Sequence, residues 1–419
     1  MTTKRRFLSA LPALVLALAF ICTFGFTLAN VASAEDLATA DKIGSISIAH
    51  ISDIHYFPIE YSYTKIAEDN YTDSDFYYSM TGDTKLVLES GAILNANVTR
   101  FVEEAKAGNA PHYLFATGDL CKNGERVALI DVANALRHLQ NEVRKVAGYE
   151  NFQVFVITGN HDLYNGSGAL YDQTDGSGYL AETVTAAQFA LIFAGLGFPN
   201  ASLDGSIGTN LSEIYPESYW SSDYTNGYVQ SSNASNLTFE YYSAMLNEGS
   251  DEYLSDWYYR LGSSRNGLSY RVEIANEDYV FFLLDGTDRE VAESPVPARI
   301  NKAEYDIIAA DGKLDEHQFF VATADGKINL TPCDDAAVKD AFSKGEPVYI
   351  NTGWNHLTGG RITEGVFNWI DLYTLAAENV GKTYVAAYHF NALPHFEQED
   401  DILKAVSYTH LTLPTKLEV

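Results

Sequence analysis

Three short apolar segments of this sequence each run directly into a polar group of Asp, Asn or His residues. The segments cover residues 43–51, 113–116 and 152–157, and they are followed by Ser52-Asp53-Ile54-His55, by Thr117-Gly118-Asp119 and by Thr158-Gly159-Asn160-His161-Asp162. β-Branched and aromatic residues fill the segments, as in strands buried on both faces of a sheet. The pattern therefore predicts a buried sheet whose strand ends carry chemically reactive side chains.

An amphipathic helix is predicted between the second and third of these strands. Five apolar residues recur there at spacings of three and four, which places them on one face of a helix. They are Leu129, Val132, Leu136, Leu139 and Val143. A strand, a helix and a second strand in this order favour parallel pairing with a right-handed crossover.

The same order of elements returns later in the chain. Residues 279–284 form an apolar segment that ends at Asp285, a helix is predicted around Phe367 and Tyr373, and the segment 383–388 ends at His389. In open α/β sheets, ligands bind beyond the carboxyl ends of the strands. We therefore expect the polar strand ends to converge at one edge of the fold.

The charge of the chain excludes one class of function. The 419 residues include 27 Lys and Arg against 56 Asp and Glu, a formal net charge of −29. A protein that holds duplex nucleic acid neutralises phosphates with a basic face, and no run of Lys or Arg follows Arg6. A hydrophobic share of 46% is typical of a globular chain with a large core. We therefore expect a folded protein that binds no nucleic acid duplex.

Residues 1–34 are predicted to be a signal peptide. Lys4, Arg5 and Arg6 precede a long apolar stretch, and Val31-Ala32-Ser33-Ala34 offers the small residues that a signal peptidase reads. Cleavage is predicted after Ala34, and the bulk of the chain is expected to be exported. No later segment is long and apolar enough for stable membrane insertion. The alternative is an uncleaved membrane anchor, because the apolar stretch approaches the roughly 20 residues that span a bilayer.

Residues 406–419 are predicted to be a non-native tail. They show no hydrophobic periodicity and look like a translated sequencing adapter, so the native chain is expected to continue beyond Ala405. A natural short tail is the alternative. Residues 35–405 then form the main domain.

A less regular insertion is predicted at about residues 165–266 of this domain. It is rich in Tyr, Ser, Asn, Asp and Gly, and an apolar helix near residues 187–196 opens it. Disordered segments are poor in aromatic residues, so the many Tyr side chains indicate an ordered excursion packed on the main body. Such an excursion either walls the functional site or has no part in it.

The polar strand ends form an ordered series of motifs, namely Asp53-x-His55, Gly118-Asp119 and Gly159-Asn160-His161-Asp162. Asp-x-His alone is weak evidence, but the whole series at strand ends is specific. On these residues the chain resembles the calcineurin-like metallophosphoesterases, over about residues 44–396. Asn123-Gly124-Glu125 and Asn266-Gly267-Leu268-Ser269-Tyr270 continue the resemblance. It implies an α/β fold, a layered β-sandwich flanked by helices.

The resemblance also implies a centre of two divalent metal ions, and Mn, Fe or Zn suit its mixed oxygen and imidazole ligands. In this interpretation Asp53 and His55 bind one ion, Asp119 bridges both ions, and Asn160 and His389 bind the second. His161 is then not a ligand. Its imidazole faces the phosphate or the leaving group and donates a proton or a hydrogen bond.

Each assignment has a structural alternative. Asp residues after strands often cap turns, Asn160 can stabilise a turn, and a lone His389 can be a satisfied structural group. His395 either lines the pocket or ends a turn. The remaining candidates, interpreted as structural, are His50, His112 and His356.

The resemblance implies hydrolysis of a phosphomonoester or phosphodiester, attacked by a metal-bound hydroxide at the dinuclear centre. The signal-like N-terminus adds secretion, and the acidic composition favours a small ester. The family normally closes its site with a late Gly-His-x-His, and none follows His395, while Phe390 stands where the family often has a second His. The alternative is therefore a noncatalytic exported binding protein with an incomplete metal site. The sequence carries no signal for an oligomeric state.

Overall fold

The computed structural model of the chain describes residues 46–65, 67, 71–83, 87–200, 229–242, 266–310 and 312–390. The predicted signal peptide, the predicted tail at 406–419 and His395 lie outside these residues. Parts of the predicted insertion, at 201–228 and 243–265, also lie outside them.

Two sheets form the centre of the molecule. The first pairs β1 (Ile48–Ile51), β2 (Tyr113–Thr117) and β3 (Gln153–Ile157) in parallel, as the strand-helix-strand pattern predicts. The second has the order β15-β8-β7-β6, with β15 parallel to β8 and the other pairs antiparallel. Its strands are β6 (Leu237–Tyr241), β7 (Tyr270–Ile274), β8 (Tyr279–Leu284) and β15 (Thr383–Tyr388).

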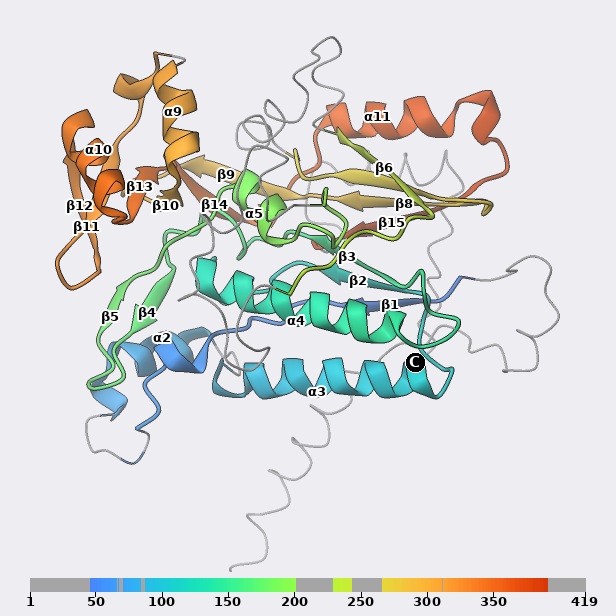
Figure 1. Ribbon diagram of the computed structural model, residues 1–419, viewed down its shortest axis with the longest axis horizontal. Coiled ribbons are helices and arrows are strands. Elements are labelled where there is room, and N and C mark those ends of the chain that lie inside the picture. Colours follow the sequence, from blue (N-terminus) through green and yellow to red (C-terminus); the bar gives the residue numbers. More distant parts are fainter. Residues whose placement is uncertain are drawn as a thin grey trace, which may run out of the picture.

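The two sheets pack face to face through aromatic rings. Phe281 of β8 lies with its ring centroid 5.2 Å from that of Phe115 and 5.8 Å from that of Phe155. Helices α3 (Val87–Lys106) and α4 (Arg126–Arg144) lie below the first sheet in Figure 1, and α11 (Glu364–Thr374) lies above the second. The predicted layered sandwich flanked by helices is therefore confirmed.

The predicted amphipathic helix is α4, which joins β2 to β3. All five apolar residues that define its predicted face are buried. Burial of a side chain of this size contributes about 1.5 to 3 kcal/mol, so this face fixes the helix against the first sheet. The structure also confirms the helix predicted around Phe367, which is α11.

The described part of the predicted insertion is ordered. It contains the hairpin of β4 (Ala169–Tyr171) and β5 (Gly178–Leu180), helix α5 (Ala186–Ile192) and strand β6. Helix α5 ends earlier than the predicted 187–196, because Gly195 and Gly197 adopt φ values of 77° and 101° that a helix does not allow. Its start is fixed by a capping box of Thr185 and Gln188.

A second insertion, which we call the inserted unit (residues 297–351), was not predicted. Its sheet has the order β10-β13-β11-β12 and its core contains Ala298, Tyr305 and Val338. Strands β9 (Thr287–Val291) and β14 (Trp354–Gly360) pair antiparallel and connect the unit to the second sheet. Its elements are β10 (Pro297–Ile300), α9 (Lys302–Ala310), β11 (Phe319–Ala322), β12 (Ile328–Cys333), α10 (Asp335–Lys344) and β13 (Val348–Asn351).

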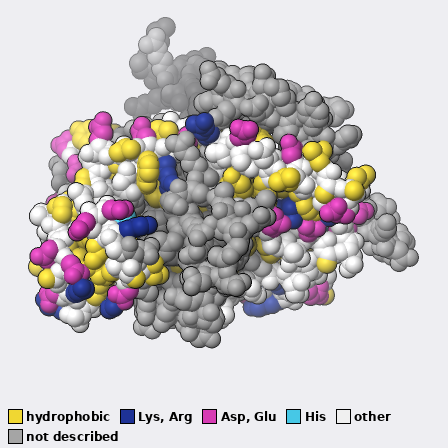
Figure 2. All heavy atoms as spheres, turned by 90° about the horizontal axis from the view of Figure 1, so that it is seen from above, with side chains coloured by type: hydrophobic (Ala, Val, Ile, Leu, Met, Phe, Trp, Pro, Cys, Tyr) yellow, Lys and Arg dark blue, Asp and Glu magenta, His cyan; other side chains and the backbone are white. Residues whose placement is uncertain are grey.

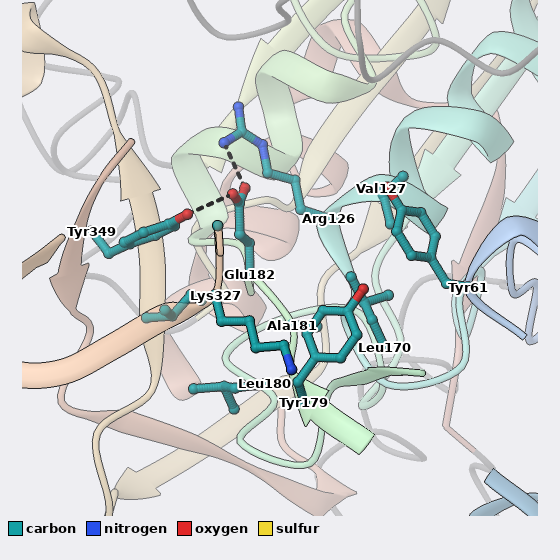
Figure 3. A pocket seen from close by; sticks show the side chains of 12 residues that line it. Tyr61, Arg126, Val127, Leu170, Tyr179, Leu180, Ala181, Glu182, Lys327 and Tyr349 are labelled. Carbon is teal, nitrogen blue, oxygen red and sulfur yellow. Dashed lines mark hydrogen bonds and ion pairs between the residues drawn. The ribbon is translucent and has the colours of Figure 1, made fainter. Parts of the chain in front are cut away.

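The half-buried carboxylate of Glu182 holds the inserted unit on the body of the fold. Its Oε2 lies 3.3 Å from Nη1 of Arg126 in α4, and its Oε1 lies 3.5 Å from Nη1 of Arg299 in β10. Tyr349 of β13 donates a hydrogen bond of 3.1 Å to Oε1 (Figure 3). A cavity of about 180 Å³ lies beside this network, between the body and the unit. The carboxylate therefore neutralises the buried guanidinium group of Arg126 and the half-buried one of Arg299, which come from separate parts of the chain.

Replacing Glu182 by Ala should lower the free energy of unfolding by about 3 kcal/mol, because the buried guanidinium group of Arg126 and the half-buried one of Arg299 then lose this carboxylate. Urea denaturation of the purified protein measures this change. Asp340→Ala is the matched control, since Asp340 pairs with Lys344 on an exposed face of α10 and exposed pairs contribute little. Equal stability of the two variants would contradict the role given to Glu182.

Candidate metal centre

The polar groups predicted from the sequence lie on loops that leave four strands at one edge of the sandwich. Asp53 and His55 follow β1, and Asp119 follows β2. Asn160 and His161 follow β3, and the site is completed by His389, which follows β15 of the second sheet. Because the two sheets pack face to face, residues from both halves of the chain meet at this edge.

Three of these side chains form a cluster that can hold a metal ion. The donor atoms of Asp53, His55 and Asp119 all lie within 4.8 Å of one another. Nε2 of His55 is 3.9 Å from Oδ1 of Asp53 and 3.7 Å from Oδ2 of Asp119. Carboxylate oxygens with an imidazole nitrogen are a donor set that suits divalent transition metals.

Asp119 stands at the middle of the site. Its Oδ1 lies 3.4 Å from Nε2 of His389, and its Oδ2 lies 4.0 Å from Nε2 of His161. The side chain is 6% exposed, whereas that of Asp53 is 60% exposed. Its two oxygens thus face different imidazoles, an arrangement that fits the predicted bridging role. Asn160 is half-buried on the loop next to His161, and its role as a ligand stays a prediction.

The loops that carry the cluster have strained backbones. Asp53, His55 and Asp119 have φ values of 55°, 45° and 50°, in the left-handed region that costs a non-glycine residue about 1 to 3 kcal/mol. Hydrogen bonds hold them there, because Asp53 N donates to Gly118 O at 3.1 Å and His55 N donates to Asp119 O at 2.9 Å. Such strain clusters at functional sites, where a rigid surrounding fold compensates for it.

Only glycine fits at two positions of the motifs, because neighbouring atoms lie too close to leave room for a Cβ. A Cβ atom on Gly159 would lie 2.2 Å from Oδ1 of Asp119 and 2.9 Å from Nε2 of His389. A Cβ atom on Gly118, whose φ is 94°, would lie 2.3 Å from the nitrogen of Gly159. The β2 and β3 loops therefore touch along their backbones, which lets the side chains of both reach one point.

The hydrogen-bond partner of Nδ1 shows which nitrogen of the neutral His389 ring carries the hydrogen. Nδ1 lies 2.7 Å from the carbonyl oxygen of Thr117, which can only accept a hydrogen bond, so Nδ1 carries a hydrogen. Nε2 then faces Asp119 and offers its lone pair when the ring is neutral. Metal-binding histidines are oriented in this way by a backbone carbonyl.

The electrostatics of the site favour positive charge. Burial opposes the charged form of His389, but the hydrogen bond and charge of Asp119 outweigh burial and raise its pKa to about 9. Burial likewise opposes ionisation of Asp119, yet the hydrogen bond and charge of His389 lower its pKa below the usual value. A divalent cation between these groups would compete with the His389 proton for the same carboxylate.

Two buried carboxylates that support the site were not assigned a role from the sequence. Asp162 is fully buried and accepts hydrogen bonds from the backbone nitrogens of Leu120 and Gly159, both at 2.8 Å. Burial and the neighbouring Asp119 raise its pKa to about 7. Asp285, at the end of β8, accepts a hydrogen bond of 2.8 Å from the hydroxyl of Thr158. The last residue of the Gly-Asn-His-Asp motif was the available signal for Asp162.

His356 also lies closer to the site than its structural interpretation implies. The ring of His161 is 5.0 Å from that of His55 and 5.9 Å from that of His356, measured between centroids. His356 belongs to β14, and its backbone nitrogen donates to Tyr164 O at 3.1 Å. No motif or spacing marks it in the sequence.

A comparison of sequences assigns the fold to a family. No curated protein matches the chain significantly. The sequence profile of the calcineurin-like phosphoesterases matches residues 46–269, from just before β1 to just before β7, which is more than half of the 419 residues. The matched part includes the three motifs at the ends of β1, β2 and β3. These residues and their geometry show that the chain belongs to the calcineurin-like phosphoesterase family.

Proposed function

We propose that the protein hydrolyses a small phosphomonoester or phosphodiester at a centre of two divalent metal ions, Mn, Fe or Zn. The observation that carries this proposal is the position of Asp119, whose oxygens face His389 on one side and His55 and His161 on the other. Membership of a family of phosphoesterases supports the reaction class.

The roles follow from the reach of each side chain. Asp53 and His55 would hold one ion, Asn160 and His389 would hold the other, and Asp119 would bridge them. When bound, the ions supply a nucleophile from water near neutral pH and neutralise charge on the phosphoryl group. His161, with its Nε2 directed to the Asp119 side of the site, would donate to the phosphate or the leaving group.

A noncatalytic exported binding protein is the second candidate. It is favoured by Phe390, whose ring packs 5.0 Å from that of His389 at the place where the family often has another imidazole. Metal analysis of the purified protein separates the two functions. About two ions per chain would support the hydrolase, and no bound metal would support the binding protein.

Export and small substrates belong to the same proposal. The signal-like sequence of residues 1–34 supports export, and mass measurement of the mature protein would locate the cleavage site. Within the described ranges, no helix has the length and apolar character to cross a bilayer. Asp and Glu side chains are spread over the face seen in Figure 2, and with a net charge of −29 they disfavour long polyanions as substrates.

Asp119→Ala should remove both metal and activity, whereas His161→Ala should keep the metal and lower kcat by about 100-fold or more, because only Asp119 is a ligand. Metal content by mass spectrometry and hydrolysis of aryl and bis-aryl phosphates measure the two effects. Equal metal loss in the two variants would contradict these roles.

Gly159→Ala should abolish metal binding although the backbone conformation at this position is open to any residue. The added Cβ would meet Oδ1 of Asp119 at 2.2 Å and its backbone nitrogen at 2.4 Å, so both the carboxylate and the loop that carries it would have to move. Gly345→Ala is the control, since its φ of 71° is strained for Ala by about 1 to 2 kcal/mol but no atom lies within 4 Å. Metal content should fall in the first variant only; retained metal in Gly159→Ala would show that Asp119 is not fixed as described.

Removal of metal by a chelator should lower the melting temperature of the wild-type protein. A ligand at 100 times its Kd stabilises the folded state by about 2.7 kcal/mol when it binds that state alone. The same chelator should leave the melting temperature of Asp119→Ala unchanged. Differential scanning calorimetry checks both, and an equal shift in the variant would mean that the stabilising ion binds elsewhere.

A further inference from the structure

A lysine ammonium group is fully buried next to the candidate metal centre. Lys122 lies three residues after Asp119, and its side chain is 0% exposed. A buried charge is costly unless hydrogen bonds compensate for it. One is provided by Ser79 of helix α2 (Asp75–Asp83), whose Oγ lies 2.9 Å from Nζ. Neither the family motif nor the proposed reaction gives this lysine a role.

The second neighbour of the ammonium group is the amide of Asn123, and the surroundings select one orientation for it. With its oxygen toward Nζ of Lys122 at 2.9 Å, its nitrogen lies 2.7 Å from the carbonyl oxygen of Lys122 and 3.0 Å from Nδ1 of His161. All three contacts are then hydrogen bonds.

The opposite orientation of the amide is repulsive. It would place the amide nitrogen against the ammonium group and the amide oxygen against the carbonyl oxygen of Lys122. It would keep the contact of 3.0 Å to Nδ1 of His161, which would then have to carry the hydrogen, and it would gain one long contact of 3.4 Å to Ser167 O. The ammonium group and the carbonyl oxygen of Lys122 therefore decide together which end of the Asn123 amide faces His161.

This orientation places the proton on the His161 ring. Because the amide nitrogen donates to Nδ1, that nitrogen must be unprotonated, and the ring hydrogen lies on Nε2. Nε2 is the atom that faces Asp119 Oδ2 at 4.0 Å. The ring thus presents an N–H group to the metal centre, and its other nitrogen is occupied.

We propose that Lys122 is a positioning residue, which acts through Asn123 to hold His161 as its Nε2–H tautomer and so presents a hydrogen-bond donor to the phosphate ester. The proposal rests on the phosphoesterase function proposed above. It selects one of the two roles left open for His161, since a neutral ring of this tautomer donates a hydrogen bond but does not give up its proton.

The tautomer is measured by ¹⁵N NMR of the imidazole nitrogens in the full-length protein, metal-free and loaded with Zn²⁺. The signals of His161 are identified by their loss in His161→Ala. We expect the Nδ1 signal of an unprotonated nitrogen and the Nε2 signal of a protonated one. A protonated Nδ1 in the wild-type protein would overturn the proposal.

Two variants test the path from the lysine to the ring. Asn123→Asp offers only acceptor oxygens to His161, so Nδ1 should become protonated. Lys122→Met keeps most of the side-chain volume but removes the charge, so signals of both tautomers should appear and kcat should fall by about 10- to 100-fold, the usual effect of losing an outer-shell partner. If Lys122→Met is folded and keeps the wild-type signals, the lysine does not act as proposed.

Lys382→Met is the matched control. Nζ of Lys382 bonds to Glu273 at 2.9 Å and to the hydroxyl of Tyr373 at 2.7 Å, so it too is a hydrogen-bonded ammonium group. It precedes β15, whereas His389 follows that strand, and six residues of strand separate the two by about 20 Å. This variant should lose stability but keep the wild-type tautomer and kcat.

The outcomes separate this proposal from the proposed function. A wild-type protein that binds no metal and hydrolyses no aryl phosphate would refute the hydrolase. The tautomer of His161, measured by NMR, would still show whether Lys122 positions the ring. A protein that hydrolyses these esters with a protonated Nδ1 on His161 would refute the role of Lys122 alone.

Discussion

The candidate site depends on the contact between the loops after β2 and β3. Gly118 and Gly159 let the two backbones touch, and the buried carboxylate of Asp162 accepts hydrogen bonds from both loops. Asp119 is fixed by this contact, because the backbone nitrogen of His161 donates to its Oδ1 at 2.9 Å. The imidazoles of His55, His161 and His389 all lie within 4.0 Å of that carboxylate. The parallel pairing of the strands supplies the rest, since it aligns their ends at one edge.

The sandwich compensates for the strain in these loops. Three non-glycine residues with positive φ are stable only where the surrounding structure leaves no alternative. Phe281 fills the space between the sheets against Phe115, and Tyr270 donates a hydrogen bond of 2.9 Å to Val156 O across the same interface. His389 and Thr117 join the two sheets at the site itself. The rigid core therefore keeps the loops in their strained conformation.

Hydrophobic periodicity predicted the parts of the fold that are buried on a regular spacing. Helix α4 and strands β2 and β3 follow this rule, because every residue of both strands is buried. The inserted unit does not follow it. Every residue of strand β12 is exposed or half-buried, so its sequence carries neither a continuous apolar run nor a clear alternation. Tertiary contacts such as that between Glu182 and Arg299 stabilise this part of the structure, and local sequence patterns do not predict such contacts.

The same distinction holds within the site. Asp53, His55, Asp119 and His161 belong to motifs with fixed spacing, and the structure brings them together at the strand ends. Lys122 and His356 have no such spacing, and their surroundings come from α2 and β14, which are distant in sequence. The sequence motif identifies His161 as a site residue, but it does not show which ring nitrogen carries the hydrogen. That property arises from the ammonium and carbonyl groups of one lysine acting on one amide, and in the proposed hydrolase it decides what the imidazole can do for a phosphate ester.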